Sequence, residues 1–191
     1  MQKKGDIETN YDIRSFDADI PLAEYKSLPK NPIYIVVDNL RSAFNVGSIF
    51  RIADILRVQG LFLCGYTAFP PHVKLKKTSL GTIEYVPWKR FERTADAVDF
   101  LKKKNIPVWA AETTSISQKY NAVSYPCELG VVFGNEALGV SREVVNMCDA
   151  VIEIPTYGFK NSLNVAAACA VIGYKFIECV NSEKGHPGDQ R

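Results

Sequence analysis

Short apolar runs alternate with amphipathic stretches along most of the chain. Five runs are continuously apolar, as strands are when both faces of a sheet are covered, and they lie at 33–38, 60–64, 108–112, 129–134 and 151–155. Between them, apolar positions recur at helical spacing over 46–58 and 91–104. The alternation predicts an α/β fold, with a mainly parallel sheet and helices on both faces.

Two further helices are predicted near the carboxyl end. Ser141 is a plausible N-cap of a short helix, and Asn161 or Ser162 opens a last helix that runs to about residue 180. Between 163 and 177 this last helix has almost no polar face, which predicts burial all round. Two interpretations stay open for it: a subunit interface, or a central core helix within one monomer.

Both ends of the chain are polar. Residues 1–32 contain Pro21 and Pro29 and show no sustained period, which predicts a loosely ordered N-terminal extension. Residues 181–191 predict a polar, disordered tail. The folded domain is therefore predicted at 33–180.

Composition narrows the class of protein. A chain of 191 residues with 47% hydrophobic residues can form one domain with a sizeable core. The net charge of +2 is too small to indicate a nucleic-acid binder, so any RNA contact needs locally clustered basic residues. Five cysteines without a CxxC pair and two histidines show no zinc spacing, so no metal is expected. The scattered thiols, the lack of an apolar leader and the absence of an apolar run near about 20 residues predict a cytoplasmic protein without a membrane role.

The common fingerprints GxGxxG, GxxxxGK[ST], HExxH and GxSxG are absent. A nucleotide kinase, a zinc hydrolase, an esterase and a dinucleotide-dependent oxidoreductase are therefore unsupported. Instead, three segments rich in Gly, Asn and Ser follow the ends of predicted strands, at 38–54, 131–141 and 152–168. The carboxyl ends of parallel strands are where ligands bind in open α/β sheets.

Each segment carries candidate site residues. Asn45 and Arg51 suit a sugar-phosphate backbone, although they also fit an N-cap and a surface charge. Gly134 would let a ligand approach the backbone and Glu136 would place a carboxylate beside it, although the two could simply form a strand-to-helix turn. The third segment adds amides and a hydroxyl to the unpaired N–H groups of a helix start. Its residues are Asn161, Ser162 and Asn164.

Taken in order, NVGSIFRIAD, FGNEALGVS and IPTYGFKNSLNVAAA closely resemble the three motifs of the SpoU (TrmH-like) family of the SPOUT RNA 2′-O-ribose methyltransferases. The resemblance covers about residues 33–180, and KTSLGTIEYVPW also looks like this family. It implies a C-terminal deep trefoil knot, a homodimer and S-adenosylmethionine held in the knot, with S-adenosylhomocysteine as the product. The implied substrate is a ribose 2′-hydroxyl in tRNA or rRNA.

The resemblance also assigns residues. Arg51 matches the family's catalytic arginine and Asn45 the asparagine that accompanies it, and the remaining polar site residues match Glu136, Ser162 and Asn164. The positions that line the methyl donor correspond to Gly134, Ile154, Leu163 and Glu112. Ala166 departs from the many relatives that carry serine there. A knotted RNA-binding or assembly factor without transfer activity is the alternative function, against which the intact polar set argues.

A basic cluster is the candidate RNA contact. Its residues are Lys74, Lys76, Lys77, Lys89, Arg90 and Arg93. Tyr85 and Trp88 lie in the same region, where an aromatic ring could stack on an unpaired base. The alternative is an ordinary solvated surface with Trp88 packed inward.

Overall fold

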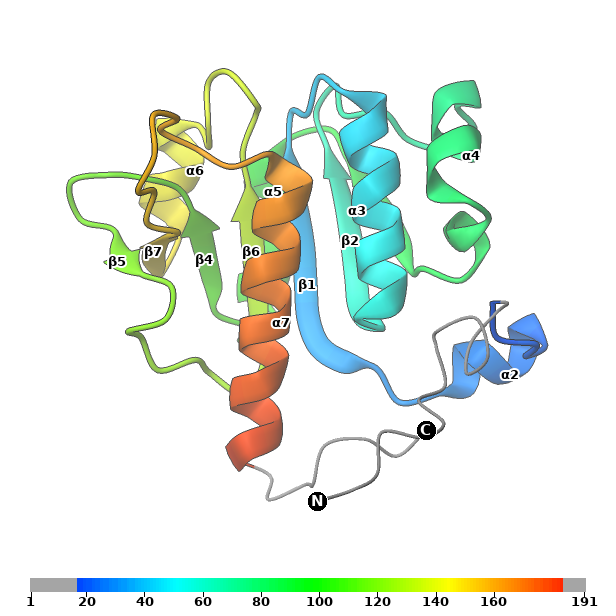
Figure 1. Cartoon of the computed structure of the whole chain (residues 1–191). Helices are drawn as coiled ribbons and strands as arrows, with labels where there is room; N and C mark the ends of the chain where they lie inside the picture. Colours follow the sequence, from blue (N-terminus) through cyan, green and yellow to red (C-terminus); the bar gives the residue numbers. More distant parts are fainter. Residues whose placement is uncertain (1–16, 184–191) are drawn as a thin grey trace, which may run out of the picture.

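The computed structural model describes residues 17–183, which form one parallel sheet with helices on both faces (Figure 1). All pairings in the seven-stranded sheet are parallel, and the strand order is β3-β2-β1-β6-β4-β7-β5. The strands are β1 (Asn31–Asp38), β2 (Val58–Cys64), β3 (Trp88–Phe91), β4 (Val108–Ala111), β5 (Gln118–Lys119), β6 (Leu129–Phe133) and β7 (Ala150–Glu153). The predicted α/β class is therefore confirmed.

Six α-helices and one 3₁₀ helix are seen in the described part of the chain. They are α2 (Leu22–Ser27), α3 (Ala43–Ile55), α4 (Val73–Ser79), η1 (Thr82–Glu84), α5 (Thr94–Lys102), α6 (Arg142–Met147) and α7 (Val165–Glu183). Alternate residues of β1 point to opposite faces of the sheet. Ile33 and Ile35 belong to the core cluster under α3, α4 and α7, whereas Tyr34 and Val36 belong to the cluster under α5 and α6.

Several predicted boundaries are wrong by a few residues. The helix expected at 46–58 starts earlier because the Ser42 side chain caps it, and it ends before Val58, which begins β2. The helix expected at 91–104 begins at Thr94 because Phe91 ends β3. Ser141 is the N-cap of α6, as predicted, and its side chain accepts a hydrogen bond from Val144 N.

The N-terminal extension is more ordered than its sequence suggests. Residues 22–27 form α2, and the Tyr25 hydroxyl donates a hydrogen bond of 2.5 Å to the Asp54 carboxylate on α3. Its ring also meets the Tyr85 ring edge-on, with 5.0 Å between centroids. The prediction of a loose segment is therefore wrong for 22–27, while residues 1–16 lie outside the described residues. Residues 181–183 of the predicted tail belong to α7, and residues 184–191 lie outside the described residues.

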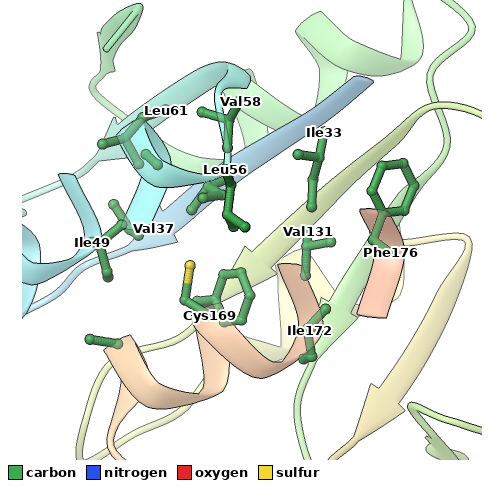
Figure 2. Packing of buried hydrophobic residues seen from close by; sticks show 14 of the residues in the cluster. Ile33, Val37, Ile49, Leu56, Val58, Leu61, Val131, Cys169, Ile172 and Phe176 are labelled. Carbon is green, nitrogen blue, oxygen red and sulfur yellow. The ribbon is translucent and has the colours of Figure 1, made fainter. Parts of the chain in front are cut away.

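Within the single chain, α7 is buried on one face, which differs from the all-round burial of a central core helix, and burial of the other face by a second subunit stays a prediction. Cys169, Ile172 and Phe176 recur at helical spacing and pack onto the sheet (Figure 2). On the opposite side Tyr174 is 58% exposed. The stretch Val165–Ser182 is long and apolar enough to cross a membrane by composition, but its contact with the sheet is that of a core helix in a globular protein.

The two phenylalanines of α3 differ in burial, so their substitution tests which face of the helix packs into the core. Phe50 is fully buried, whereas Phe44 on the same helix is 59% exposed. We expect Phe50→Ala to lower the free energy of unfolding by about 3 to 5 kcal/mol, because it leaves a cavity. The matched Phe44→Ala should change it by less than about 1 kcal/mol. Urea unfolding followed by circular dichroism measures both, and equal losses would contradict this description of α3.

Candidate functional site

The three polar segments meet at the carboxyl edge of the sheet. They follow β1, β6 and β7, and because these strands are parallel their ends lie on the same side (Figure 1). The first segment leads into α3, the second forms the turn before α6, and the third leads into α7. Residues more than 90 positions apart therefore come into contact here.

Glu136 ties the turn after β6 to the start of α3. Its two carboxylate oxygens accept hydrogen bonds from Arg41 N at 2.9 Å and Ser42 N at 3.1 Å. The Asn45 side-chain amide donates a third bond of 2.8 Å to the same carboxylate. In the structure Glu136 therefore holds the loop that leads into α3.

Asn164 joins this pair to the start of α7. Its amide nitrogen donates to Asn45 Oδ1 at 3.0 Å, and its amide oxygen accepts from Ala166 N at 2.9 Å. Asn164 therefore caps α7, which corrects the expectation that Asn161 or Ser162 opens that helix. The three motifs are linked through Glu136, Asn45 and Asn164, which we call the polar bridge.

The alternative reading of Asn45 as an N-cap is wrong. Ser42 is the N-cap of α3, and its hydroxyl accepts a hydrogen bond of 3.3 Å from Asn45 N. Because the backbone of Asn45 is held in the first turn, its side chain stays free to join Glu136 and Asn164. The residue thus supplies a donor to one motif and an acceptor to the other.

The hydrogen bonds of Glu136 set its pKa. Partial burial by itself raises this pKa, but the bonds from Arg41 N, the Asn45 amide and Ser42 N favour the ionised form. The net effect is a pKa below the ordinary glutamate value of 4.5. The carboxylate is therefore charged at neutral pH.

A pocket of about 830 Å³ opens beside the polar bridge. Its walls include seven of the predicted site residues, namely Glu112, Gly134, Glu136, Ile154, Ser162, Leu163 and Asn164. Glutamates 112, 136 and 153 line it, and none of the lining residues is Lys or Arg. Apolar side chains of β7 and α7 form another part of the wall. The pocket is therefore acidic with an apolar side.

Close backbone packing shapes one wall of this pocket. A Cβ on Gly134 would lie 2.1 Å from the carbonyl carbon of Gly139, so only glycine fits there. Gly139 has a φ of +68°, and a Cβ on it would lie 2.2 Å from the Glu112 carboxylate. That carboxylate accepts a hydrogen bond of 2.8 Å from Val140 N. Glu112 therefore holds the turn as well as facing the pocket.

Asn135 is a site residue that the sequence reasoning missed. Its side chain is buried and donates to Asn39 O at 2.6 Å and to the Tyr66 hydroxyl at 2.7 Å. Its oxygen accepts from Ala137 N at 2.8 Å and Leu138 N at 3.0 Å. A polar residue directly after a buried strand was the available signal, since a buried amide needs partners.

Arg51 lies apart from the polar bridge. Its side chain is exposed on α3, lines none of the cavities described, and makes no hydrogen bond or ion pair within residues 17–183. Asn45 and Arg51 are six residues apart, so they point about 120° away from each other around the helix. Ser162 is also exposed, and its hydroxyl donates to Asn161 Oδ1 at 3.5 Å.

The candidate RNA contacts do not form one patch. Three of them, Lys74, Lys76 and Lys77, are exposed on α4. The Arg90 guanidinium lies 4.3 Å from the centre of the Phe69 ring. Lys89 points to the other face of β3, with its ammonium 4.4 Å from the centre of the Phe100 ring. Their role in RNA binding stays a prediction.

The remaining residues of that region are engaged within the chain. Arg93 forms a solvent-exposed ion pair of 3.1 Å with Glu143. Trp88 is half-buried and packs against the main core, as the alternative interpretation expected. Within residues 17–183, no cluster of three His, Cys, Asp or Glu side chains could hold a metal ion.

Fold and site together define an α/β protein with an acidic ligand pocket at the carboxyl edge of a parallel sheet. The chain belongs to the SpoU rRNA methylase family, which it matches over residues 32–174. The match includes all three polar segments.

A curated relative of the chain is named as a member of the same family. The chain is 31% identical over 165 residues to a protein of Staphylococcus saprophyticus named as a TrmH family tRNA/rRNA methyltransferase, covering 86% of this chain and 65% of the relative. It therefore spans just under two thirds of the length of that curated relative.

Two solved structures show the same fold. The TrmH/SpoU tRNA modifying enzyme of A. aeolicus is 26% identical, with a TM-score of 0.76, and the match covers 86% of this chain and 82% of that one. The SpoU methyltransferase AviRb of Streptomyces viridochromogenes, solved with AdoMet, is 24% identical, with a TM-score of 0.72. That match covers 84% of this chain and 64% of AviRb.

The lowered pKa of Glu136 makes stability depend on pH. A carboxyl whose pKa is lower in the folded state adds stability above its unfolded value, and this contribution is lost as the pH falls through the folded value. We expect the wild type to be more stable than Glu136→Gln at neutral pH. The difference in free energy of unfolding between the two proteins should become smaller as the pH drops below 4.5. Urea unfolding at several pH values measures it, and a gap independent of pH would contradict the assignment.

Proposed function

We propose that this chain binds S-adenosylmethionine in the acidic pocket and transfers its methyl group to a ribose 2′-hydroxyl of tRNA or rRNA. Family membership supports RNA methylation, and AviRb, a protein of the same fold, was solved with this methyl donor. The observation that carries the proposal is a pocket of suitable charge that the second and third family motifs line and that Asn45 joins to the first motif.

The pocket fits the methyl donor chemically. A volume of about 830 Å³ suits a small-molecule ligand, since such pockets hold roughly 300 to 1,000 Å³. S-adenosylmethionine carries a sulfonium and an ammonium group, and carboxylates without competing Lys or Arg side chains complement those positive charges. Ile154 and Leu163 offer an apolar wall to the adenine ring. The bound donor supplies an electrophilic methyl group.

The residues of the chain then position the acceptor. Methyl transfer needs the ribose oxygen in line with the methyl group, so most of the rate comes from alignment. Asn45 and Asn164 hold each other at the pocket rim, where they orient the sugar, and Ser162 has an exposed hydroxyl that can bond a phosphate. Glu136 keeps this rim together through the α3 start.

In this proposal Arg51 stabilises negative charge and does not act as a base. A guanidinium stays protonated at any ordinary pH, so it is a poor proton acceptor. We assign it to the phosphate next to the reacting ribose and to the developing alkoxide, with the proton leaving to phosphate or water. Its exposed position on α3 leaves it free to meet RNA.

The proposal includes a homodimer, a C-terminal knot and a cytoplasmic location. Large apolar side chains are exposed on α7, in the loop before it and in the turn after β6, which favours contact with a second copy. They are Leu138, Tyr157, Phe159, Leu163 and Tyr174. The knot follows from the family resemblance, in the segment that joins β7 to α7.

Donor binding and transfer are tested separately. Calorimetric titration with S-adenosylmethionine should show one site per chain, with a dissociation constant of about 1 μM to 1 mM. Tritium from the labelled methyl group should then appear in RNA, and nuclease digestion should recover it as 2′-O-methylated nucleosides. Binding without transfer would favour the knotted assembly factor, and label on a base would refute the ribose assignment.

Arg51→Lys separates charge from geometry. The lysine keeps the positive charge but loses the planar fork that binds phosphate at two points. We expect turnover to fall by about 100-fold or more, with unchanged affinity for S-adenosylmethionine, since Arg51 does not line the pocket. Single-turnover tritium transfer measures the first and calorimetry the second. Near-normal turnover would remove Arg51 from the mechanism.

A further inference from the structure

A second cavity lies on the other side of the α3 start. This open cleft of about 610 Å³ is formed by the loop after β1, the loop after β2 and the beginning of α4. We call it the aromatic cleft. Its lining residues are Arg41, Ser42, Ala43, Phe44, Tyr66, Thr67, Ala68, Phe69, Pro71, His72 and Lys74.

Two aromatic rings of the cleft face solvent. Phe44 is 59% exposed and Tyr66 is 61% exposed, although rings of this size normally gain by burial. The Tyr66 ring is also held in place, because its hydroxyl accepts a hydrogen bond of 2.7 Å from the Asn135 amide and its backbone N donates to Asn39 Oδ1 at 3.2 Å. A fixed, exposed ring is a preorganised stacking surface.

The charge of the cleft is opposite to that of the acidic pocket. Arg41, His72 and Lys74 line it, and none of its lining residues is Asp or Glu. The guanidinium of Arg90 lies over Phe69 and adds a further cation next to the cleft. His72 Nδ1 accepts a hydrogen bond of 3.3 Å from Lys74 N, so Nε2 is the ring nitrogen that can donate to a ligand. Cations beside open aromatic rings suit an RNA strand.

The cleft and the acidic pocket share a wall. Arg41 and Ser42 line the cleft, while their N–H groups bind Glu136, which lines the pocket. Phe44 and Arg51 are seven residues apart on α3 and therefore lie within about 20° of each other around the helix. A strand that places its ribose at the polar bridge would thus bring a neighbouring nucleotide to the cleft.

We propose that the aromatic cleft binds an unpaired base next to the methylated nucleotide. The base stacks on Phe44 and Tyr66, and its phosphate contacts Arg41 and Lys74. This inference rests on the proposed function, because it takes RNA as the substrate. It adds that the substrate is single-stranded or flipped out at the position beside the target, since a paired base cannot present its face.

Fluorescence of a short single-stranded oligoribonucleotide with 2-aminopurine tests the cleft without the methyl donor. Stacking on an aromatic ring quenches this base. We expect quenching with the wild type, and about tenfold weaker binding with less quenching for Phe44→Ala and Tyr66→Ala. Tyr66→Phe keeps the ring and should retain most of both. Ile116→Ala, an exposed apolar residue between β4 and β5, is the matched control and should bind as the wild type does.

Charge and strandedness are tested in the same assay. Arg41→Gln keeps the backbone N–H that Glu136 accepts but removes the cation, so it should weaken binding and lower the salt dependence. Lys103→Gln, exposed at the end of α5, is its control. A duplex of the same sequence should bind more weakly and be insensitive to Phe44→Ala.

Three results would overturn the inference. The first is wild-type affinity for the oligoribonucleotide in Phe44→Ala and Tyr66→Ala, and the second is an equal loss of affinity in Tyr66→Phe and Tyr66→Ala. The third is an effect of Phe44→Ala that is the same for the duplex and the single strand. Circular dichroism shows that each variant is folded. Calorimetry with S-adenosylmethionine keeps the two proposals distinguishable, because the cleft can fail while donor binding and transfer persist. Conversely, RNA can stack in the cleft of a chain that binds no methyl donor.

Discussion

The carboxylate of Glu136 is the contact on which the site depends. Parallel strands bring three loops to one edge of the sheet, but loops at an edge still need something to hold them in register. Glu136 accepts hydrogen bonds from two backbone N–H groups and from the Asn45 amide. Asn45 in turn accepts a hydrogen bond from Asn164 at the start of α7. Bonds to an ionised acceptor are stronger than neutral ones, so a single carboxylate can organise all three loops.

The same carboxylate separates two cavities of opposite charge. On one side lies an acidic pocket suited to a positively charged methyl donor, and on the other a cleft of aromatic and basic residues suited to RNA. Asn135 extends the connection, because its amide nitrogen donates to the Tyr66 hydroxyl in the cleft while its amide oxygen accepts from the backbone of the turn along the pocket. The two cavities are therefore built from shared loops, which would hold the proposed donor and RNA in a constant relative position.

The parts of the fold predicted from sequence are those with a strong local signal. Continuous apolar runs marked β1 and β6, because central strands are covered on both faces. Strand β3, with sequence WKRF, was not predicted because it carries charged residues in the middle, as an edge strand can. Helix α2 was missed for a similar reason: it has no buried residue, and Tyr25 anchors it to α3 through a single side chain.

The sequence by itself determined the fold class, the order of the three motifs and seven of the residues that line the pocket, since these follow from apolar periodicity and motif identity. Only the tertiary structure decided that Asn45 bonds both Glu136 and Asn164, and that α7 keeps one face open within the chain. The reason is physical. A hydrogen bond between residues more than 90 positions apart leaves no trace in local pattern, and one-sided burial depends on which partner surface the chain itself provides.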